Sequence, residues 1–451
     1  MSSAVTAERA TLPEAARDLL DRIEAREARV GVVGLGYVGL PLALAFAEHG
    51  FPTLGFDVDR AKVAALAAGE SYLLGCAPAR VRALTAAGRL DATADFARLG
   101  EPDAVLICVP TPLTPQREPD TGYIERTAEA LRPRLRPGQL VVLESTTYPG
   151  TTEGLLRAAL ERDGLACGAD FFLAYSPERE DPGNPRFDAA SIPKVVGGVD
   201  PVSAALARAL YEKVVPATVV VSSARAAEAT KLTENVFRAV NIALVNELKM
   251  VFDRMGIDVW EVLDAAETKP FGFMRFDPGP GWGGHCIPLD PFYLSWKARE
   301  YGAPTRFIEL AGEINLAMPG YVVGKLQEAL NRGRRAVAGS RVLLLGIAYK
   351  RDVADPRESP AFELIDRLLA LGAEVAYHDP LIPEAPAMRT WPDLPPLVSR
   401  PLTAELLAAQ DAVVVVTDHS GVDYDLVLEH APLVVDARGV YRRPHPKVVK
   451  A

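Results

Sequence analysis

Short apolar runs alternate with helix-length stretches through the first two hundred residues. Proline and glycine lie near the ends of several of these runs, and residues 39–49 between the first two runs have the apolar content of a buried helix. This alternation of strand and helix predicts a parallel, doubly wound α/β sheet. The runs are 29–33, 52–57, 104–109, 140–144, 171–175 and 194–198.

A different pattern begins near residue 224. Residues 224–255 contain no helix breaker, and their many apolar positions indicate a long helix that is buried on more than one side. We interpret it as the spine of a helical middle domain and as a dimer contact, although an ordinary interdomain helix would show the same pattern. After Pro319 the alternation resumes. The predicted elements are strands at 341–345, 374–378, 412–416 and 433–435, and a helix at 361–371.

A chain of 451 residues is too long for one ordinary core, so several domains are expected. The patterns predict two Rossmann-like doubly wound parallel-sheet domains joined by a central helical domain. We place the N-terminal domain at 1–203, the central domain at 204–318 and the C-terminal domain at 319–451.

Composition narrows the class of protein. With 49% hydrophobic and 24% charged residues the chain is globular, and its net charge of −10 argues against a nucleic-acid partner. Local lysines and arginines can still bind an anionic small molecule. No signal peptide and no apolar stretch of membrane-spanning length is present, so no membrane partner is expected.

The cysteines are scattered and form no CxxC pair, which favours reduced thiols in a cytoplasmic enzyme over disulfides or a metal site. They are Cys76, Cys108, Cys167 and Cys286.

A dinucleotide fingerprint opens the predicted helix 39–49. In Gly34-Leu35-Gly36-Tyr37-Val38-Gly39, the first glycine permits a tight turn, the second allows a pyrophosphate to approach, and the third lets the helix pack on the strand. The phosphates then meet the free N–H groups at the helix start. We therefore expect a dinucleotide cofactor, with Tyr37 and Val38 beside it.

An acidic residue specifies the cofactor further. Asp57 ends the second strand, 23 residues after Gly34, where it can bind the adenosine ribose and repel a 2′-phosphate, which favours NAD. Lys62 can neutralise a cofactor phosphate, although a solvated helix lysine would look the same. Val109 and Thr111 end another strand on the side where the cofactor is expected.

Cys286 is the candidate nucleophile. It lies among glycines at 279, 281, 283 and 284, which allow backbone and ligand to approach closely, and a thiolate is competent to attack an aldehyde. Asp290 follows four residues later. The alternative is a buried structural cysteine, the more common role of this residue type. A thiol combined with a dinucleotide site suggests oxidation of an alcohol to a carboxylate in two hydride transfers.

Two further groups carry candidate chemistry. Lys231 and Asn235 are four residues apart on one face of the predicted helix 224–255, where a cation and an amide can stabilise an oxyanion. Glu178 lies in a charged segment with Arg179 and Glu180 and is a candidate general base. Solvated surfaces are the alternative for both groups.

Six segments, in this order, resemble the UDP-glucose/GDP-mannose dehydrogenase family over nearly the whole chain. They are GLGYVGLPLA at 34–43, ESTTYPGTT at 144–152, SPERE at 176–180, KLTEN at 231–235, GPGWGGHCIPLDP at 279–291 and GIAYKRDVADPRES at 346–359.

The resemblance implies an NAD domain, a helical dimerisation domain and a C-terminal domain that binds UDP. It also implies a four-electron oxidation of a sugar C6 alcohol to the carboxylate with two NAD, through a thiohemiacetal and a thioester on Cys286. Lys231 and Asn235 would stabilise oxyanions, Asp290 would position a lysine or water, and Glu178 would assist thioester hydrolysis.

The same resemblance implies the remaining contacts. Thr147 would lie by the cofactor and a catalytic water, Arg357 would face the cofactor, and Lys350 would contact the substrate. The other implied substrate contacts are Arg179, Glu180, Gly281, Gly283 and Tyr349.

Within the family, the segments SPEREDPGN and GGHCIPLDPFYLSWKA resemble the branch that oxidises UDP-N-acetylhexosamines for surface polysaccharides. UDP-N-acetylglucosamine is the favoured substrate, and UDP-N-acetylmannosamine or UDP-glucose are the alternatives. A catalytically silent nucleotide-sugar sensor and a two-electron dehydrogenase of the 6-phosphogluconate type are rival interpretations, but neither needs a nucleophilic cysteine.

Overall fold

The computed structural model describes residues 12–73, 75–114, 116–161, 164–179, 191–284, 287–388 and 390–451, in two compact units, 1–234 and 235–451. Each unit contains one β-sheet, and a helical region lies between the two sheets in the sequence. The predicted α/β class is thereby confirmed. The three-domain division stays a prediction, and its boundaries fall inside helices α8 (Pro201–Tyr211) and α12 (Arg306–Arg332).

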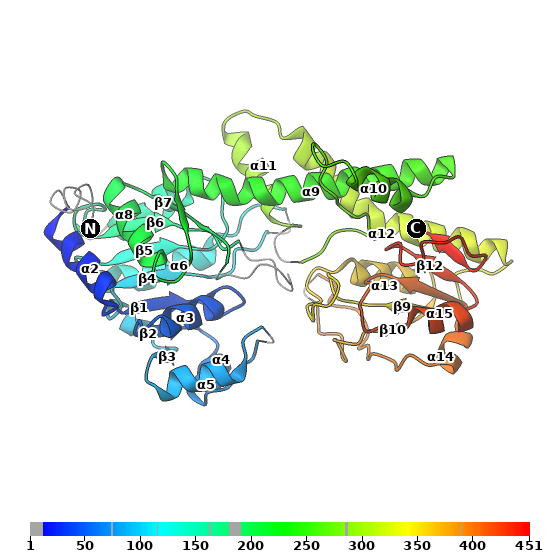
Figure 1. Cartoon of the computed structure of the whole chain (residues 1–451), viewed down its shortest axis with the longest axis horizontal. Coiled ribbons are helices and arrows are strands. Elements are labelled where there is room, and N and C mark those ends of the chain that lie inside the picture. Colours follow the sequence, from blue (N-terminus) through cyan, green and yellow to red (C-terminus); the bar gives the residue numbers. More distant parts are fainter. Residues whose placement is uncertain are drawn as a thin grey trace. The chain divides into compact units, whose positions relative to one another are not determined.

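The first sheet has eight strands in the order β3-β2-β1-β4-β5-β6-β7-β8 (Figure 1). The order of its first six strands is that of a dinucleotide-binding sheet, and its direction of winding reverses between β1 and β4. The strands are β1 (Val30–Val33), β2 (Thr53–Phe56), β3 (Leu90–Thr93), β4 (Ala104–Ile107), β5 (Leu140–Leu143), β6 (Phe172–Tyr175), β7 (Lys194–Gly198) and β8 (Thr218–Val220).

The predicted direction of β7 is wrong, because β7 runs antiparallel to β6, with Ala174 opposite Gly198 and Tyr175 opposite Gly197. An apolar strand is buried in the same way whichever direction it runs, so its residues do not reveal the direction. The sequence also missed β3 and β8, the edge strands, which are only partly buried and lack a continuous apolar run.

Successive residues of the central strands face opposite sides of the first sheet, and helices cover both sides. Val32 packs with α2, α3 and α8, whereas Val33 packs with α6, α7 and the first turns of α9. The described α-helices of this unit are α2 (Glu14–Ala25), α3 (Gly39–Glu48), α4 (Arg60–Ala67), α5 (Pro78–Ala86), α6 (Gly122–Leu131), α7 (Arg157–Leu160), α8 (Pro201–Tyr211) and the start of α9 (Ala224–Met255).

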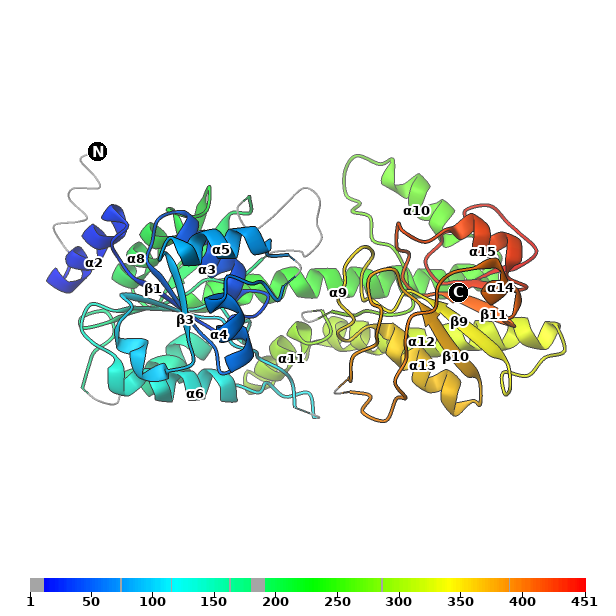
Figure 2. The same cartoon turned by 90° about the horizontal axis from the view of Figure 1, so that it is seen from below.

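The second sheet has five parallel strands in the order β10-β9-β11-β12-β13, and its winding reverses between β9 and β11. Helices α12 and α13, which lie side by side in Figure 2, cover one face, and α14 and α15 cover the other. The elements are β9 (Arg341–Leu345), α13 (Pro360–Ala370), β10 (Glu374–His378), α14 (Ala404–Ala408), β11 (Ala412–Val415), α15 (Tyr424–His430), β12 (Val434–Asp436) and β13 (Val448–Lys450).

The long helix α9 spans 32 residues and confirms the predicted helix 224–255. In the second unit it packs with α10 (Val259–Glu267), and α11 (Asp290–Glu300) packs with α12. Buried Asn246 of α9 donates to the side-chain oxygen of Asn315 of α12 at 2.8 Å and accepts from the N–H of Gly279 at 2.9 Å. This amide pair fixes the start of the glycine-rich segment. None of the described helices is long and apolar enough to cross a membrane.

Candidate functional site

The loop between β1 and α3 is shaped by three glycines. At Gly34, φ is +90° and a Cβ atom would lie 2.5 Å from the carbonyl oxygen of Cys108. At Gly39 a Cβ atom would lie 1.8 Å from the carbonyl oxygen of Gly34. At Gly36, no described atom lies within 4 Å of the same position. Protein atoms crowd the loop at Gly34 and Gly39 and leave it open at Gly36. This arrangement fits a pyrophosphate bound at the start of a helix.

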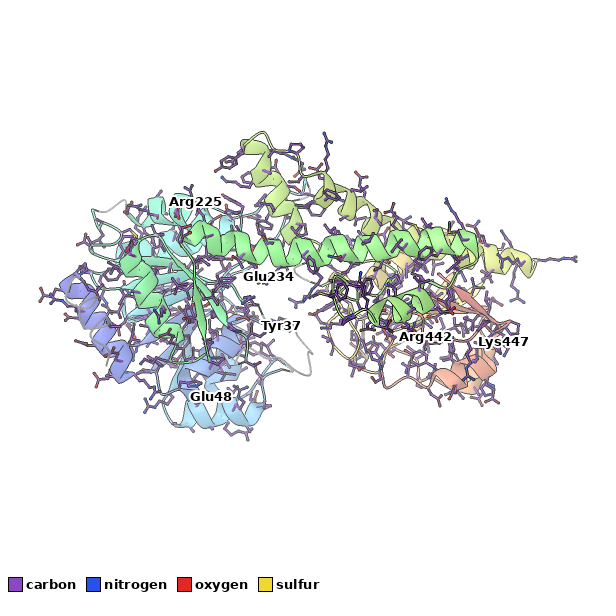
Figure 3. All side chains as sticks on the ribbon, turned by 45° about the horizontal axis from the view of Figure 1, so that its top comes forward. Tyr37, Glu48, Arg225, Glu234, Arg442 and Lys447 are labelled. Carbon is purple, nitrogen blue, oxygen red and sulfur yellow. The ribbon has the colours of Figure 1, made fainter. Side chains whose placement is uncertain are left out.

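Tyr37 and Val38 occupy the two positions before the first helical residue, Gly39. The Tyr37 side chain is 51% exposed and is labelled on the surface of the first unit in Figure 3. The N–H groups of Leu40 and Leu42 donate to the carbonyl oxygens of Gly36 and Val38 at 3.1 and 3.2 Å, so the glycine loop runs directly into the first turn of α3. The positive end of the helix dipole at this start favours a bound anion.

Asp57 follows β2 directly and is buried. Its Oδ2 accepts a hydrogen bond from the N–H of Leu35 at 2.9 Å, and its Oδ1 accepts from the N–H of Asp59 at 2.9 Å. The carboxylate therefore fixes the glycine loop as well as closing the strand. Lys62, on α4, lies 3.4 Å from Asp57 Oδ2, so the structure pairs it with the acidic residue.

The ends of β4 and β5 meet at the same edge of the sheet. Ser145 donates its hydroxyl hydrogen bond to the carbonyl oxygen of Val109 at 2.7 Å. Thr111 and Thr147 are both buried, and the hydroxyl groups of Thr147 and Thr151 are 2.6 Å apart. Three of the predicted cofactor residues, Val109, Thr111 and Thr147, thus lie on two neighbouring loops.

Glu228 of α9 holds the loop that follows Thr147. Its carboxylate accepts from the N–H of Gly150 at 2.5 Å, and from the N–H and the hydroxyl of Thr152 at 2.8 and 2.7 Å. Glu228 is fully buried, and burial raises its pKa to about 7, although the three donors lower it. This carboxylate replaces the N-cap that the start of the following helical turn would otherwise lack.

Glu178 and Arg179 follow the end of β6. Glu178 accepts from the N–H of Arg179 at 2.7 Å and lies 3.5 Å from the ammonium group of Lys194. Arg179 pairs with Glu234 of α9 at 2.6 Å and donates to the carbonyl oxygen of Pro193 at 2.7 Å. Glu180 lies outside the described residues.

Two predicted residues lie one turn apart on α9. Lys231 and Asn235 are both buried, which excludes the solvated surface that was their alternative. Asn235 donates its amide hydrogen bond to Oδ2 of Asp290, the first residue of α11, at 2.5 Å. Asp290 is buried as well. The structure therefore joins the amide of the KLTEN segment to Asp290. From the sequence, Asp290 was expected to position a lysine or a water, and its pairing with Asn235 was not predicted.

The glycine-rich segment packs against the loop that follows β9 in the same unit. A Cβ atom at Gly283 would lie 2.8 Å from Cβ of Tyr349 and 2.8 Å from the carbonyl oxygen of Glu358, and Gly284 donates to the carbonyl oxygen of Arg357 at 3.1 Å. At Gly281, φ is +132°. The close approach that the glycines permit is made here by protein. His285 and Cys286 lie outside the described residues.

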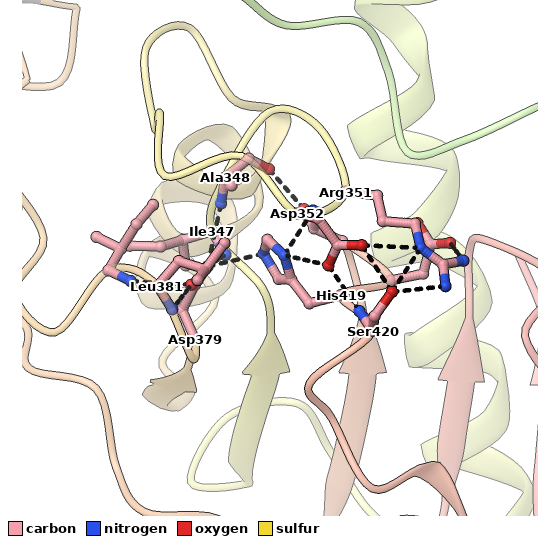
Figure 4. Close-up of polar contacts among 11 residues, drawn as sticks. Ile347, Ala348, Arg351, Asp352, Asp379, Leu381, His419 and Ser420 are labelled. Atoms are coloured by element: carbon pink, nitrogen blue, oxygen red, sulfur yellow. Dashed lines mark hydrogen bonds and ion pairs between the residues drawn. The ribbon is translucent and has the colours of Figure 1, made fainter. Parts of the chain in front are cut away.

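The loop after β9 carries Tyr349 and Lys350, and the buried carboxylate of Asp379 holds the start of this loop. Asp379 Oδ2 accepts from the N–H of Ile347 at 2.7 Å, and its Oδ1 accepts from the N–H of Leu381 at 2.8 Å (Figure 4). Burial raises the pKa of Asp379, but its hydrogen bonds with His419 and these N–H groups lower it further, below its usual range.

His419 connects this acid to the middle of the same loop. Its Nε2 lies 3.2 Å from Asp379 Oδ2, and its Nδ1 accepts from the N–H of Asp352 at 3.0 Å (Figure 4). These partners assign the ring proton to Nε2. Further along the loop, Arg357 pairs with Asp355 at 2.6 Å. The loop is thus fixed at both ends of Lys350.

Several residues of the site were missed from the sequence. Glu144, Lys194 and Tyr211 form a buried polar cluster, Glu228 anchors a loop, and Asp379 with His419 anchors another. One signal was present in the sequence: Lys194 opens an apolar run, and Glu144 ends one. A charged residue in such a run is buried only when it has a partner, but the sequence does not name the partner.

Comparison with known protein families shows that three regions of this chain match three domains of one family. Sequence models of the UDP-glucose/GDP-mannose dehydrogenase family match residues 28–215 as its NAD binding domain, 225–317 as its central domain and 343–443 as its UDP binding domain.

Individual relatives differ in their sugar. UDP-N-acetyl-D-glucosamine 6-dehydrogenase of Pseudomonas aeruginosa is 38% identical over 81% of this chain and 86% of its own. NDP-N-acetyl-D-galactosaminuronic acid dehydrogenase of Ralstonia nicotianae is 36% identical over 91% and 96%. The structure of a UDP-D-ManNAc dehydrogenase from Pyrococcus horikoshii has a TM-score of 0.84 at 31% identity, covering 94% of this chain and 98% of that chain.

Asp57→Asn tests the role of the acidic residue after β2. The amide oxygen retains an acceptor for Leu35, but the negative charge that opposes a 2′-phosphate is lost. We expect the preference for NAD over NADP to fall by about tenfold or more, equivalent to about 1.4 kcal/mol. Ratios of kcat/KM for the two cofactors measure it, with Asp59→Asn as the control. An unchanged ratio would remove Asp57 from cofactor selection.

Glu228→Gln tests the buried carboxylate on α9. Because its pKa is raised in the folded protein, Glu228 binds a proton more tightly there than in the unfolded chain, so stability is lost as pH rises from about 4.5 to about 7. Glutamine does not titrate. The free energy of unfolding of the variant, relative to the parent protein, should therefore rise by about 2–3 kcal/mol between pH 4 and pH 8.5.

Denaturant titrations at the two pH values measure this difference, with exposed Glu129→Gln as the control. A parallel pH dependence in the parent protein and Glu228→Gln would contradict the raised pKa. Parallel curves that are offset by a constant belong to the same outcome, because the offset reports only the exchange of a carboxylate oxygen for an amide.

Proposed function

The chain belongs to the UDP-glucose/GDP-mannose dehydrogenase family, and on that premise we propose that it oxidises the C6 alcohol of a UDP-N-acetylhexosamine to the carboxylate. It is an NAD-dependent nucleotide-sugar dehydrogenase. UDP-N-acetylglucosamine is the favoured substrate. UDP-N-acetylmannosamine is the first alternative, because relatives that are 33% and 35% identical carry that name. UDP-glucose remains the third candidate.

The observation that carries the proposal is the buried hydrogen bond between Asn235 and Asp290. It brings a segment of α9 to the residue four positions after Cys286. A buried amide and a buried carboxylate, the latter four positions from a candidate nucleophile in the sequence, suit a reaction that generates an oxyanion. A catalytically silent sensor would not need these groups.

We assign the steps as follows. The C6 alcohol loses a hydride and a proton, and the Cys286 thiolate adds to the resulting aldehyde to form a thiohemiacetal. Loss of a second hydride, together with the hydroxyl proton of the thiohemiacetal, gives a thioester. Water hydrolyses the thioester to the carboxylate and the free thiolate with release of two protons. Lys231 and Asn235 stabilise the oxyanions, and Asp290 holds Asn235 in place. When bound, NAD accepts the hydride in each oxidation, so two NAD are consumed per sugar.

The remaining predicted residues take binding roles in this proposal, except Glu178, which acts as a base. Thr147 holds the water near the cofactor, and Glu178 receives the proton of the water that attacks the thioester. Tyr349 and Lys350 contact the substrate from the loop that Asp379 and His419 fix. The proposed cofactor contacts are Gly34, Gly36, Tyr37, Val38, Gly39, Asp57, Lys62, Val109, Thr111 and Arg357, and the other substrate contacts are Arg179, Glu180, Gly281 and Gly283.

The assay supplies UDP-N-acetylglucosamine, UDP-N-acetylmannosamine and UDP-glucose separately and follows NADH at 340 nm. We expect preference for the first sugar and two NADH per sugar consumed. Cys286→Ser should abolish net turnover yet still bind NAD, whereas Cys167→Ser should remain active. One NADH per sugar, or full activity of Cys286→Ser, would rule out the covalent route. Preference for another sugar would correct the substrate alone.

We also propose that the enzyme is a homodimer. Helix α9 exposes Phe237, Leu244 and Val251, which are seven residues apart and so form one stripe, and Met255 continues it. Their exposed fractions lie between 43% and 65%. We propose that a second copy of the chain covers this stripe, because a two-fold axis brings the same surface of both subunits together. The cytoplasmic location and the role in surface polysaccharide synthesis remain predictions.

Leu244→Glu tests the dimer. A charge in the centre of the stripe would be buried in the dimer without a partner. We therefore expect the dissociation constant of the dimer to rise by about tenfold or more, so that the variant is largely monomeric at micromolar concentration. Light scattering coupled to size exclusion measures the mass. Val398→Glu, at an exposed apolar position outside α9, is the matched control. A monomeric parent protein, or a dimer unaffected by Leu244→Glu, would exclude this surface.

A further inference from the structure

A buried lysine lies among the groups that follow the first sheet's strands, and no step assigned above uses it. Lys194 opens β7 and is only 6% exposed. Because β7 runs antiparallel to β6, its first residue lies at the edge where β5 and β6 end. Glu144 comes directly after β5, and Glu178 comes three residues after β6.

The ammonium group of Lys194 is shared by two carboxylates. Its Nζ lies 2.8 Å from Glu144 Oε2 and 3.5 Å from Glu178 Oε2, and it also donates to the carbonyl oxygen of Pro177 at 3.4 Å. The other oxygen of Glu144 accepts a short hydrogen bond from the hydroxyl of Tyr211 on α8. Glu144 is therefore held from both sides, and Lys194 is fixed between it and Glu178.

The protonation states of the buried groups leave Lys194 as a cation between carboxylates. Burial on its own lowers the pKa of Lys194, but the carboxylates of Glu144 and Glu178 outweigh it and raise the pKa, so the lysine stays protonated. Burial raises the pKa values of the neighbouring Tyr211 hydroxyl and Cys108 thiol well above their usual range, so both stay neutral. Lys194 is the cation that faces Glu178 from this cluster.

We infer that Lys194 is a positioning residue for thioester hydrolysis, which orients the Glu178 carboxylate and keeps it ionised. The inference rests on the proposed function, in which water adds to the thioester carbonyl carbon. The C–S bond then breaks, the sulfur leaves as a thiolate, and the proton of the water passes to Glu178. A carboxylate that had already been protonated, or that had rotated away, would not accept it.

The alternative is that Lys194 only neutralises Glu144 in the protein interior. Lys194→Met alone does not separate the two roles, because it leaves Glu144 buried without its cation, which is strongly destabilising. The double variant Lys194→Met/Glu144→Gln removes both charges and keeps a side chain that can bond to Tyr211. Glu144→Gln alone is its matched control, and Lys194→Arg retains the cation.

The experiment mixes each enzyme with NAD and the preferred UDP-sugar from the panel above. It records the burst and the steady rate of NADH formation and the intact mass of the quenched protein. For the double variant we expect two NADH per active site in the burst and a steady rate at least about tenfold below that of Glu144→Gln. A covalent sugar adduct should accumulate, the acid limb of the pH–rate profile should move to higher pH, and Lys194→Arg should restore part of the steady rate.

The outcomes separate the inference from the function beneath it. A steady rate within about twofold of Glu144→Gln would overturn the role of Lys194, as would equal slowing of burst and steady rate with no adduct. Lys213→Met, at a half-buried lysine outside the cluster, should behave like the parent protein. If the parent protein itself releases no NADH from any of the three sugars, the proposed function fails, and the positioning role in its hydrolysis step fails with it.

Discussion

Parallel strand pairing is the constraint on which the first unit's chemistry depends. Since β1, β2, β4, β5 and β6 run in one direction, the residues that follow them emerge at one edge of the sheet. Gly34, Asp57, Val109 and Thr147 follow four of these strands, and Glu178 follows the fifth. Residues more than a hundred positions apart are thereby placed along one edge, without any of them having to be close in the sequence.

Buried polar groups then fix the loops at that edge and at the edge of the second sheet. Glu228 holds the loop after Thr147, Asp57 holds the glycine loop, and Asp379 with His419 holds the loop that carries Lys350. A buried carboxylate is costly unless it is fully hydrogen-bonded, so each is bound to specific N–H groups. The loops in turn have little freedom to move, which is what a site that positions reacting atoms needs.

Much of the cofactor site was accessible from the sequence because its signals are local. The three glycines, the helix they open and the acid at the end of the next strand all lie within 24 residues, and each has a recognisable conformational reason. The anchoring groups were not accessible. His419 is 67 residues from Asp352, whose backbone N–H donates to it, and Glu228 is 78 residues from Gly150. Nothing in either sequence neighbourhood identifies the partner.

By itself the sequence determined the class of fold, most of the strands, the 32-residue helix and the glycine loop, because periodicity and backbone conformation are local properties. The tertiary structure alone decided that β7 runs antiparallel to β6. The reversal moves Lys194 to the edge where Glu144 and Glu178 lie, and a parallel β7 would have carried it to the opposite edge. Strand direction depends on the path of the connecting chain, whereas the apolar pattern of a strand reads the same in both directions.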